Sequence, residues 1–155
     1  MFNNTVKLLA VNTFIIAVLI VAYFYGYISQ FFTNDITHLS YVMLGLMAYS
    51  IWFITRAVYI ADEAYVSKEL IPKFVSNIGH ARYLMFAFPF IGLLGTLYGF
   101  IHVVVGIASA GNDVSAIVEA MRTGLLTLFN TTFIGIFCLL WISFQLHLTS
   151  NLKED

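Results

Sequence analysis

Long uncharged stretches alternate with short charged ones along this chain. Four stretches of at least 20 residues contain no Lys, Arg, Asp or Glu: residues 8–34, 36–55, 83–112 and 123–152. A helix needs roughly 20 apolar residues to cross the hydrocarbon core of a bilayer. Helices are favoured because lipid cannot satisfy free backbone groups, and these stretches lack the alternating pattern of a membrane β-barrel. The pattern therefore predicts an all-α integral membrane protein with four transmembrane helices.

Turn signals set the expected ends of these helices. We expect helices over about residues 6–32, 38–70, 83–110 and 114–149, in a single transmembrane domain over 1–155. The polar segment 33–37 and the Gly-Asn-Asp sequence at 111–113 predict tight turns, so neighbouring helices should run antiparallel. We expect the second helix to continue past Arg56 and to end before Pro72, with a short connection through residue 81.

Composition and charge agree with a membrane protein. The chain is 61% hydrophobic and only 10% charged, whereas typical soluble domains have about 25% charged residues. The net charge of -1 gives no reason to expect nucleic-acid binding. Cys138 is the single cysteine, and no cluster of His, Asp, Glu or Cys suggests a metal site, a cofactor site or an enzyme.

The basic residues predict the orientation in the membrane. Six of the seven fall on the side that holds both termini and the connection between the second and third helices: Lys7, Arg56, Lys68, Lys73, Arg82 and Lys153. Only Arg122 falls on the other side. Because cytoplasmic loops carry the excess of Lys and Arg, we expect a multi-pass protein with both termini in the cytoplasm.

Glycines form a stripe along the third predicted helix. Gly92, Gly95 and Gly99 follow spacings of three and four residues, which place them on one face. In lipid, such a stripe lets a second helix approach closely, and helix packing alone explains it. Thr96 lies one residue off the stripe near the middle of the span, where its hydroxyl either bonds to its own backbone or faces water.

Polar residues are dense in the fourth predicted helix. Thr127, Asn130, Thr131 and Thr132 lie in an otherwise apolar part of it. Such groups either join helices by hydrogen bonds or line a wet cavity, and the residues alone leave both readings open. In the third helix, His102 is a candidate proton relay, or else a packing group.

None of the four predicted membrane spans contains an Asp or Glu residue. A proton or sodium path through a bilayer usually needs an ionisable carboxylate. If this chain conducts ions, we therefore expect a partner protein to supply that group.

Two segments of the third and fourth helices carry recognisable motifs. Residues 87–102 read AFPFIGLLGTLYGFIH, and residues 124–136 read GLLTLFNTTFIGI. The first resembles the A-P-x-I-G-L-x-G-T-V-W-G-I-M motif of the MotA/TolQ/ExbB proton-channel family, closest to its TolQ and ExbB branch. The second is similar, without gaps, to the family's G-I-A-E-A-L-x-A-T-A-I-G-L, with Gly124, Thr132 and Gly135 on its Gly, Thr and Gly.

The resemblance implies a function. Members form a homopentameric ring around a dimeric partner of the MotB/TolR/ExbD class, which has one transmembrane span with an aspartate. Ion flow past that aspartate drives mechanical work, so the resemblance implies a motor channel subunit of a bacterial inner membrane. By resemblance, Thr96 and Thr132 pair at the pore beside the aspartate, and Gly92, Gly95, Gly99 and Gly135 pack the helices.

The departures from the family pattern keep alternatives open. Thr127 stands where TolQ and ExbB have a glutamate, four spans match the flagellar branch, and the large cytoplasmic region is nearly absent. Asn130, Thr131 and Thr127 could favour a hydrated cation, so the ion is H⁺ or Na⁺. The alternative function is a non-conducting structural subunit of a membrane assembly with the same fold.

Overall fold

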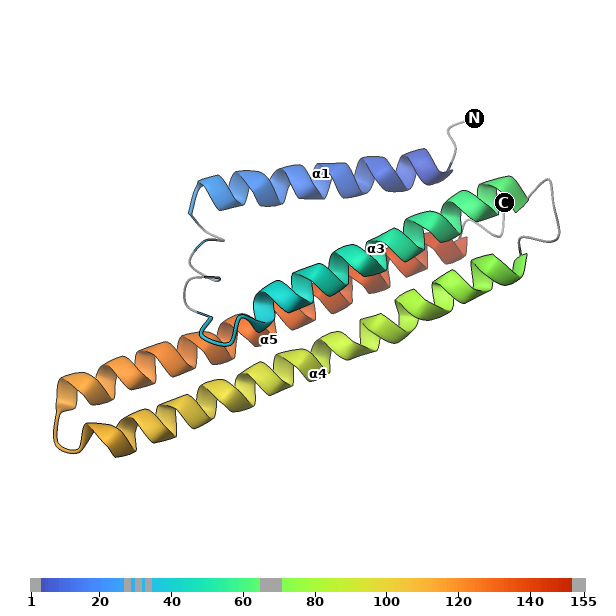
Figure 1. Ribbon diagram of the computed structural model, residues 1–155. Helices are drawn as coiled ribbons and strands as arrows, with labels where there is room; N and C mark the ends of the chain where they lie inside the picture. The colour runs from blue at the N-terminus through green and yellow to red at the C-terminus, as the bar shows by residue number, and fades with distance from the viewer. Residues whose placement is uncertain (1–3, 27–28, 30–31, 33–34, 65–70, 152–155) are drawn as a thin grey trace.

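Four long helices make up nearly all of the described structure (Figure 1). The computed structural model describes residues 4–26, 29, 32, 35–64 and 71–151. The helices are α1 (Asn4–Phe24), α3 (Leu39–Ala64), α4 (Ile71–Ala110) and α5 (Val114–Asn151). Each contains a stretch long and apolar enough to cross a membrane, which confirms the prediction of four apolar helices.

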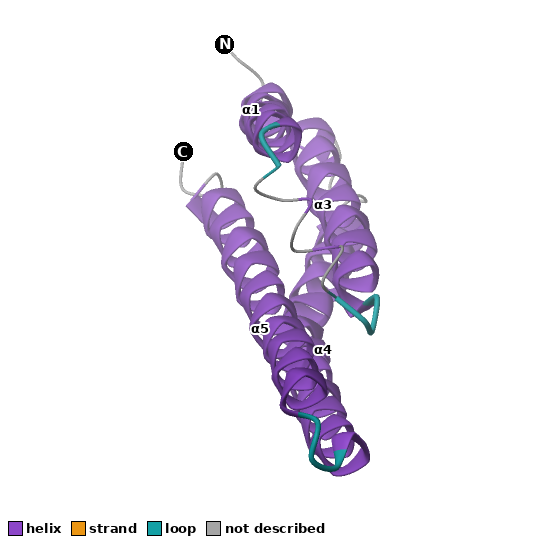
Figure 2. Ribbon diagram, turned by 90° about the vertical axis from the view of Figure 1, so that its left-hand side faces the viewer, coloured by secondary structure: helices purple, strands orange, loops and turns teal. Residues whose placement is uncertain are grey.

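The α4–α5 hairpin is the largest feature of the fold. α3 packs against both of its helices, whereas α1 lies apart and packs mainly against α3 (Figure 1, Figure 2). The turn end of the hairpin projects beyond α1 and beyond the start of α3 (Figure 1). α4 has 40 residues and is therefore about 60 Å long, roughly twice the thickness of the hydrocarbon core of a bilayer.

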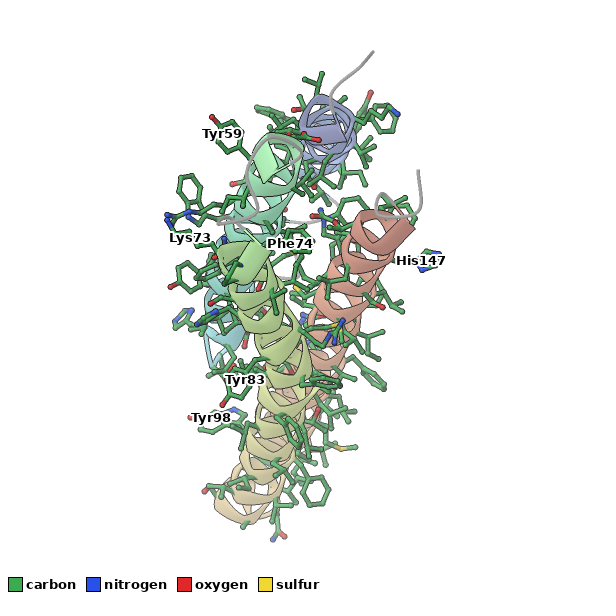
Figure 3. All side chains as sticks on the ribbon, turned by 90° about the vertical axis from the view of Figure 1, so that its right-hand side faces the viewer. Tyr59, Lys73, Phe74, Tyr83, Tyr98 and His147 are labelled. Atoms are coloured by element: carbon green, nitrogen blue, oxygen red, sulfur yellow. The ribbon has the colours of Figure 1, made fainter. Side chains whose placement is uncertain are left out.

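The larger of two buried apolar clusters among the described residues lies between α3, α4 and α5. Fully buried apolar side chains come from all three helices: Met43, Ile54, Phe88, Cys138 and Ile142. The outer surface is apolar too, as the side chains around the bundle in Figure 3 show; Phe24 is 81% exposed and Tyr83 is 78% exposed. A surface this rich in large apolar side chains is suited to lipid or to other subunits.

The first helix is shorter than the sequence predicts. We expected it to reach residue 32, but α1 ends at Phe24 and a turn follows. Gly26 adopts a left-handed φ of 80°, and its N–H donates to the Tyr23 carbonyl oxygen at 2.9 Å. Glycine commonly ends a helix this way because it lacks a Cβ. Most of the remaining predicted segment lies outside the described residues.

The third helix starts earlier than predicted. We expected a connection from Pro72 to residue 81 and a helix from residue 83, but α4 is continuous from Ile71. Pro72 lies in its first turn, where a missing N–H costs no intrahelical hydrogen bond. The prediction of a connection over residues 72–81 was therefore wrong, because this segment belongs to α4. The predicted end of the second helix, residues 65–70, lies outside the described residues.

A buried aspartate organises the turn before α3. Asp35 is 1% exposed; its Oδ1 accepts the Thr37 hydroxyl at 2.6 Å, and its Oδ2 accepts the Ser40 N–H at 2.9 Å. Burial raises the pKa of the Asp35 carboxyl, but hydrogen bonds from Ser40 and Thr37 outweigh it, so the pKa lies below its ordinary value. Asp35 thus acts as a charged cap at the start of α3.

Candidate ion-path site

Glycines bring the backbones of α4 and α5 into direct contact. Gly92, Gly95 and Gly99 are all buried against α5. A Cβ on Gly99 would lie 2.7 Å from the Gly124 carbonyl oxygen, and one on Gly95 would lie 2.6 Å from the Thr131 side chain. No side chain larger than hydrogen fits at these two positions without a shift of the neighbouring helix.

The same contact continues at the other end of the stripe. A Cβ on Gly135 would lie 3.0 Å from the Phe88 carbonyl oxygen and 3.5 Å from the Met43 sulfur of α3. A Cβ on Gly92 would lie 3.3 Å from the Thr131 carbonyl oxygen. Gly135 therefore lies where three helices meet, and close packing sets the relative height of α4 and α5.

That register places two threonine hydroxyls side by side. Thr96 Oγ1 of α4 and Thr132 Oγ1 of α5 are 2.6 Å apart. Each is also within reach of a carbonyl oxygen one turn back on its own helix, Gly92 at 3.0 Å and Leu128 at 2.9 Å. A hydroxyl has one proton and two lone pairs, so most lone pairs of the two hydroxyls remain open to an outside donor or a cation.

The surroundings of the threonine pair are apolar. Thr96 and Thr132 are partly exposed. Exposed apolar side chains lie one turn away on either side: Leu93, Phe100, Phe129 and Ile136. The only acidic residues between 71 and 151 are Asp113 and Glu119, and Glu119 is 13 residues, about 20 Å of helix, from Thr132.

The other three polar candidates of α5 face inward. Thr127 and Thr131 are fully buried, and Asn130 is 7% exposed. The Thr127 hydroxyl donates to the Thr123 carbonyl oxygen at 3.1 Å, and the Thr131 hydroxyl donates to the Thr127 carbonyl oxygen at 2.9 Å. The structure therefore divides the five polar candidates into an accessible pair, Thr96 and Thr132, and a buried group of three within the helix packing.

His102 is separated from the threonine pair. It lies six residues beyond Thr96 on α4, about 9 Å further along the helix, and it is partly buried. It makes no hydrogen bond to another described residue. A relay through His102 therefore stays a prediction. Within the described chain, no group of three or more His, Cys, Asp or Glu residues could hold a metal ion.

Two buried polar contacts of α1 were not anticipated from the sequence. Gln145 Nε2 of α5 donates to Asn12 Oδ1 of α1, and both side chains are buried. The Thr5 hydroxyl of α1 donates to an Asp62 carboxylate oxygen of α3 at 2.6 Å. Asn12 and Gln145 are isolated amides in apolar stretches, and that isolation was the available signal, but their 133-residue separation hides the pairing.

A sequence model of the MotA/TolQ/ExbB proton channel family matches residues 68–154. The match covers more than half of the chain and includes all of α4 and α5. The chain belongs to this family. No curated protein and no solved structure matches it. As a MotA/TolQ/ExbB member with four apolar helices, it is a multi-pass membrane protein with a general channel- or stator-type role.

The family match covers the α4–α5 hairpin but not α1 and α3. The matched region contains the glycine contacts, the threonine pair and the buried Thr127–Thr131 group. α1 and α3 precede residue 68 and lie outside it. The residues that could carry the family's channel-type role are therefore those of the α4–α5 hairpin.

Proposed function

We propose that this MotA/TolQ/ExbB member is the channel subunit of a motor in a bacterial inner membrane. Five copies, each with four antiparallel spans and both termini in the cytoplasm, form a ring around the transmembrane helices of a dimeric partner. The partner is of the MotB/TolR/ExbD class and supplies a membrane aspartate. Flow of H⁺, or of Na⁺, through this assembly is coupled to mechanical work.

The observation that carries this proposal is the Thr96–Thr132 pair, with its oxygens 2.6 Å apart and partly exposed among apolar side chains. A protonated carboxyl group can donate to either hydroxyl oxygen, and a carboxylate can accept from whichever hydroxyl turns toward it. The pair can therefore solvate both protonation states of a neighbouring acid without adding a fixed charge. Such a site suits alternating binding and release of a proton.

A partner is required because the hairpin has no acid of its own near this level. Glu119 is about 20 Å of helix away from Thr132, and it forms an ion pair with Arg122 at 2.8 Å. A charge in the middle of the membrane is costly unless it is paired or neutralised. An aspartate delivered by another chain would be neutral when protonated among the apolar side chains, and would be solvated by the threonines when ionised.

The buried polar group has a different part in this proposal. Thr127 and Thr131 have no exposed surface in the chain, and their hydroxyls are used within α5. We assign them to packing and the accessible pair to the ion path. Hydroxyl oxygens can accept hydrogen bonds and can also coordinate sodium, so the flux experiment has to distinguish H⁺ from Na⁺.

The test is ion flux in vesicles that contain the chain and the single-span protein encoded beside it. Thr96→Val and Thr132→Val keep the shape and remove the hydroxyl. Loss of a hydrogen bond to a charged group costs about 1.5 kcal/mol or more, so we expect flux to fall roughly tenfold or more in each variant. Thr96→Ser keeps the hydroxyl and should retain flux, and Thr131→Val should conduct normally if Thr131 only packs.

Two outcomes would contradict the proposal. Full flux in both valine variants would show that the threonine pair is not the path. A stable assembly that conducts neither H⁺ nor Na⁺, together with a neighbouring protein that lacks a membrane acid, would favour the non-conducting structural subunit. Measuring flux with and without sodium in the buffer distinguishes the two ions.

A further inference from the structure

A cleft opens between α3 and α4 near the ends of these helices that lie next to the 65–70 segment. Its volume is about 400 Å³, and six of the described residues line it: Arg56, Ile60, Pro72, Lys73, Ser76 and Asn77. Arg56 comes from α3 and Lys73 from α4, so two cationic side chains from different helices meet at one cleft. No carboxylate is among the described residues that line it.

The position of Lys73 is electrostatically unfavourable for the protein alone. Lys73 lies in the first turn of α4, the end at which the helix dipole is positive. A cation there is disfavoured, and no acidic residue lies in that turn to offset it. Arg56 adds a second positive charge to the same cleft. The combined field of these groups favours an anion.

The described part of the chain does not supply that anion. Arg56, Lys73, Ser76 and Asn77 make no side-chain hydrogen bond or ion pair with another described residue. The nearby carboxylate of Asp62 accepts two hydrogen bonds from Thr5 of α1 instead. The polar groups of the cleft are therefore available to a ligand.

The surroundings of the cleft have features that are typical of a membrane surface. Arg56 and Lys73 lie near the ends of the apolar stretches of α3 and α4. Tyr59 and Tyr83 are 52% and 78% exposed, and Figure 3 shows them projecting on the same side of the bundle as Lys73. Tyrosine is enriched at the level of lipid headgroups. Ile60 and Pro72 give the cleft an apolar part beside its charged part.

We propose that this cleft binds the phosphate headgroup of an anionic phospholipid, with phosphatidylglycerol as the simplest case. Arg56 can bind two phosphate oxygens at once, and Lys73 adds a second charge-assisted contact. Ser76 and Asn77 can bind the glycerol and ester oxygens. Basic pockets between transmembrane helices are known to take such headgroups. This assignment does not rest on the proposed channel function.

The test measures lipid retention on the whole chain purified in mild detergent. Native mass spectrometry would follow binding of phosphatidylglycerol and of phosphatidylcholine, which carries no net charge. We expect preferential retention of phosphatidylglycerol, and a reduction of about tenfold or more in the Arg56→Gln/Lys73→Gln variant. Arg82→Gln is the matched control, because Arg82 is an exposed cation of α4 outside the cleft.

Three outcomes would overturn the assignment. Equal retention of the two lipids would remove the preference for an anion. An equal loss in Arg82→Gln would show diffuse attraction to surface charge instead of a site. Displacement of the lipid by millimolar inorganic phosphate would identify a soluble phosphate as the ligand. If the double variant does not fold, Lys73→Gln alone tests the proposal, since Lys73 is exposed and makes no side-chain hydrogen bond or ion pair with another described residue that its loss would break.

Discussion

The α4–α5 interface and the attachment of α1 to the bundle are built in opposite ways. α4 and α5 meet through glycines, with backbone against backbone at Gly99 and Gly124. α1 contacts its neighbours less closely, and two polar pairs join it to them: Thr5 with Asp62, and Asn12 with Gln145. Close backbone contact thus marks the first interface, which also holds the threonine pair, whereas polar pairs mark the second.

The difference shows how helices are held where the hydrophobic effect does not act. Lipid is as apolar as leucine, so helices associate in a membrane through van der Waals contact or through hydrogen bonds. Close contact requires complementary surfaces along many turns, and it cannot tolerate added atoms. A hydrogen bond needs only one position on each helix, and it tolerates loose packing elsewhere. The hairpin should therefore be sensitive to bulk, and α1 to the loss of polarity.

The largest effect is expected from Gly99→Ala. The new Cβ would meet the Gly124 carbonyl oxygen at 2.7 Å and the Leu128 nitrogen at 3.0 Å, and backbone atoms cannot rotate away. We expect a loss of about 3 kcal/mol, at the upper end for overpacking, measured as a lower unfolding midpoint in mild detergent.

Gly79→Ala is the matched control for that substitution. Gly79 belongs to the same helix, and a Cβ there would have nothing within 4 Å. Alanine favours a helix by about 1 kcal/mol over glycine, so stability should be unchanged or slightly higher. A similar loss in both variants would mean that α4 needs glycine for some reason other than close contact with α5.

An intermediate effect is expected from breaking the amide pair. Gln145→Leu leaves the Asn12 side chain buried without its partner and should cost about 1–2 kcal/mol. The double variant Asn12→Leu/Gln145→Leu removes both polar groups, so it should recover much of that loss. Unfolding of both variants and of Asn12→Leu gives the coupling energy, expected to be about 0.6–1.7 kcal/mol. Additive losses would show that the pair does not hold α1.

The smallest effect is expected at the turn that joins the two regions. Asp35→Asn keeps the shape but weakens the cap at Ser40 and Thr37, and should cost about 1 kcal/mol. The lowered pKa means that the ionised carboxyl stabilises the fold above its unfolded pKa. That contribution should disappear as pH falls through the folded pKa, below 3.8.

A pH series of unfolding midpoints checks the Asp35 prediction. The native chain should lose stability on acidification into this range, and Asp35→Asn should lose less. The pKa of Asp113 is also lowered, by hydrogen bonds from Ser115 and Ala116 at the exposed start of α5. Asp113 is present in both chains, so the difference between the two pH profiles reports on Asp35. Identical pH profiles for the native chain and Asp35→Asn would contradict the assigned role of Asp35.

The sequence predicted the parts of the structure that depend on long uniform patterns. Four uncharged stretches identified the four apolar helices, and motif resemblance paired Thr96 with Thr132, whose hydroxyls lie 2.6 Å apart. The predictions were wrong where a single residue sets the end of a helix. Pro72 fits either side of a helix boundary by composition, and Gly26 ends α1 through a backbone angle that no apolar pattern records. Contacts such as Asn12 with Gln145 depend on the tertiary packing.

The length of the hairpin has a mechanical consequence. Two helices in backbone contact at Gly92 and Gly99 cannot slide past one another, because sliding would bring their side chains onto each other's backbone. The two helices therefore act as a single stiff unit that resists bending. A push on the Gly111 turn, beyond the ends of α1 and α3, would be carried along about 60 Å of paired helix to the opposite end of α4 with little loss in displacement.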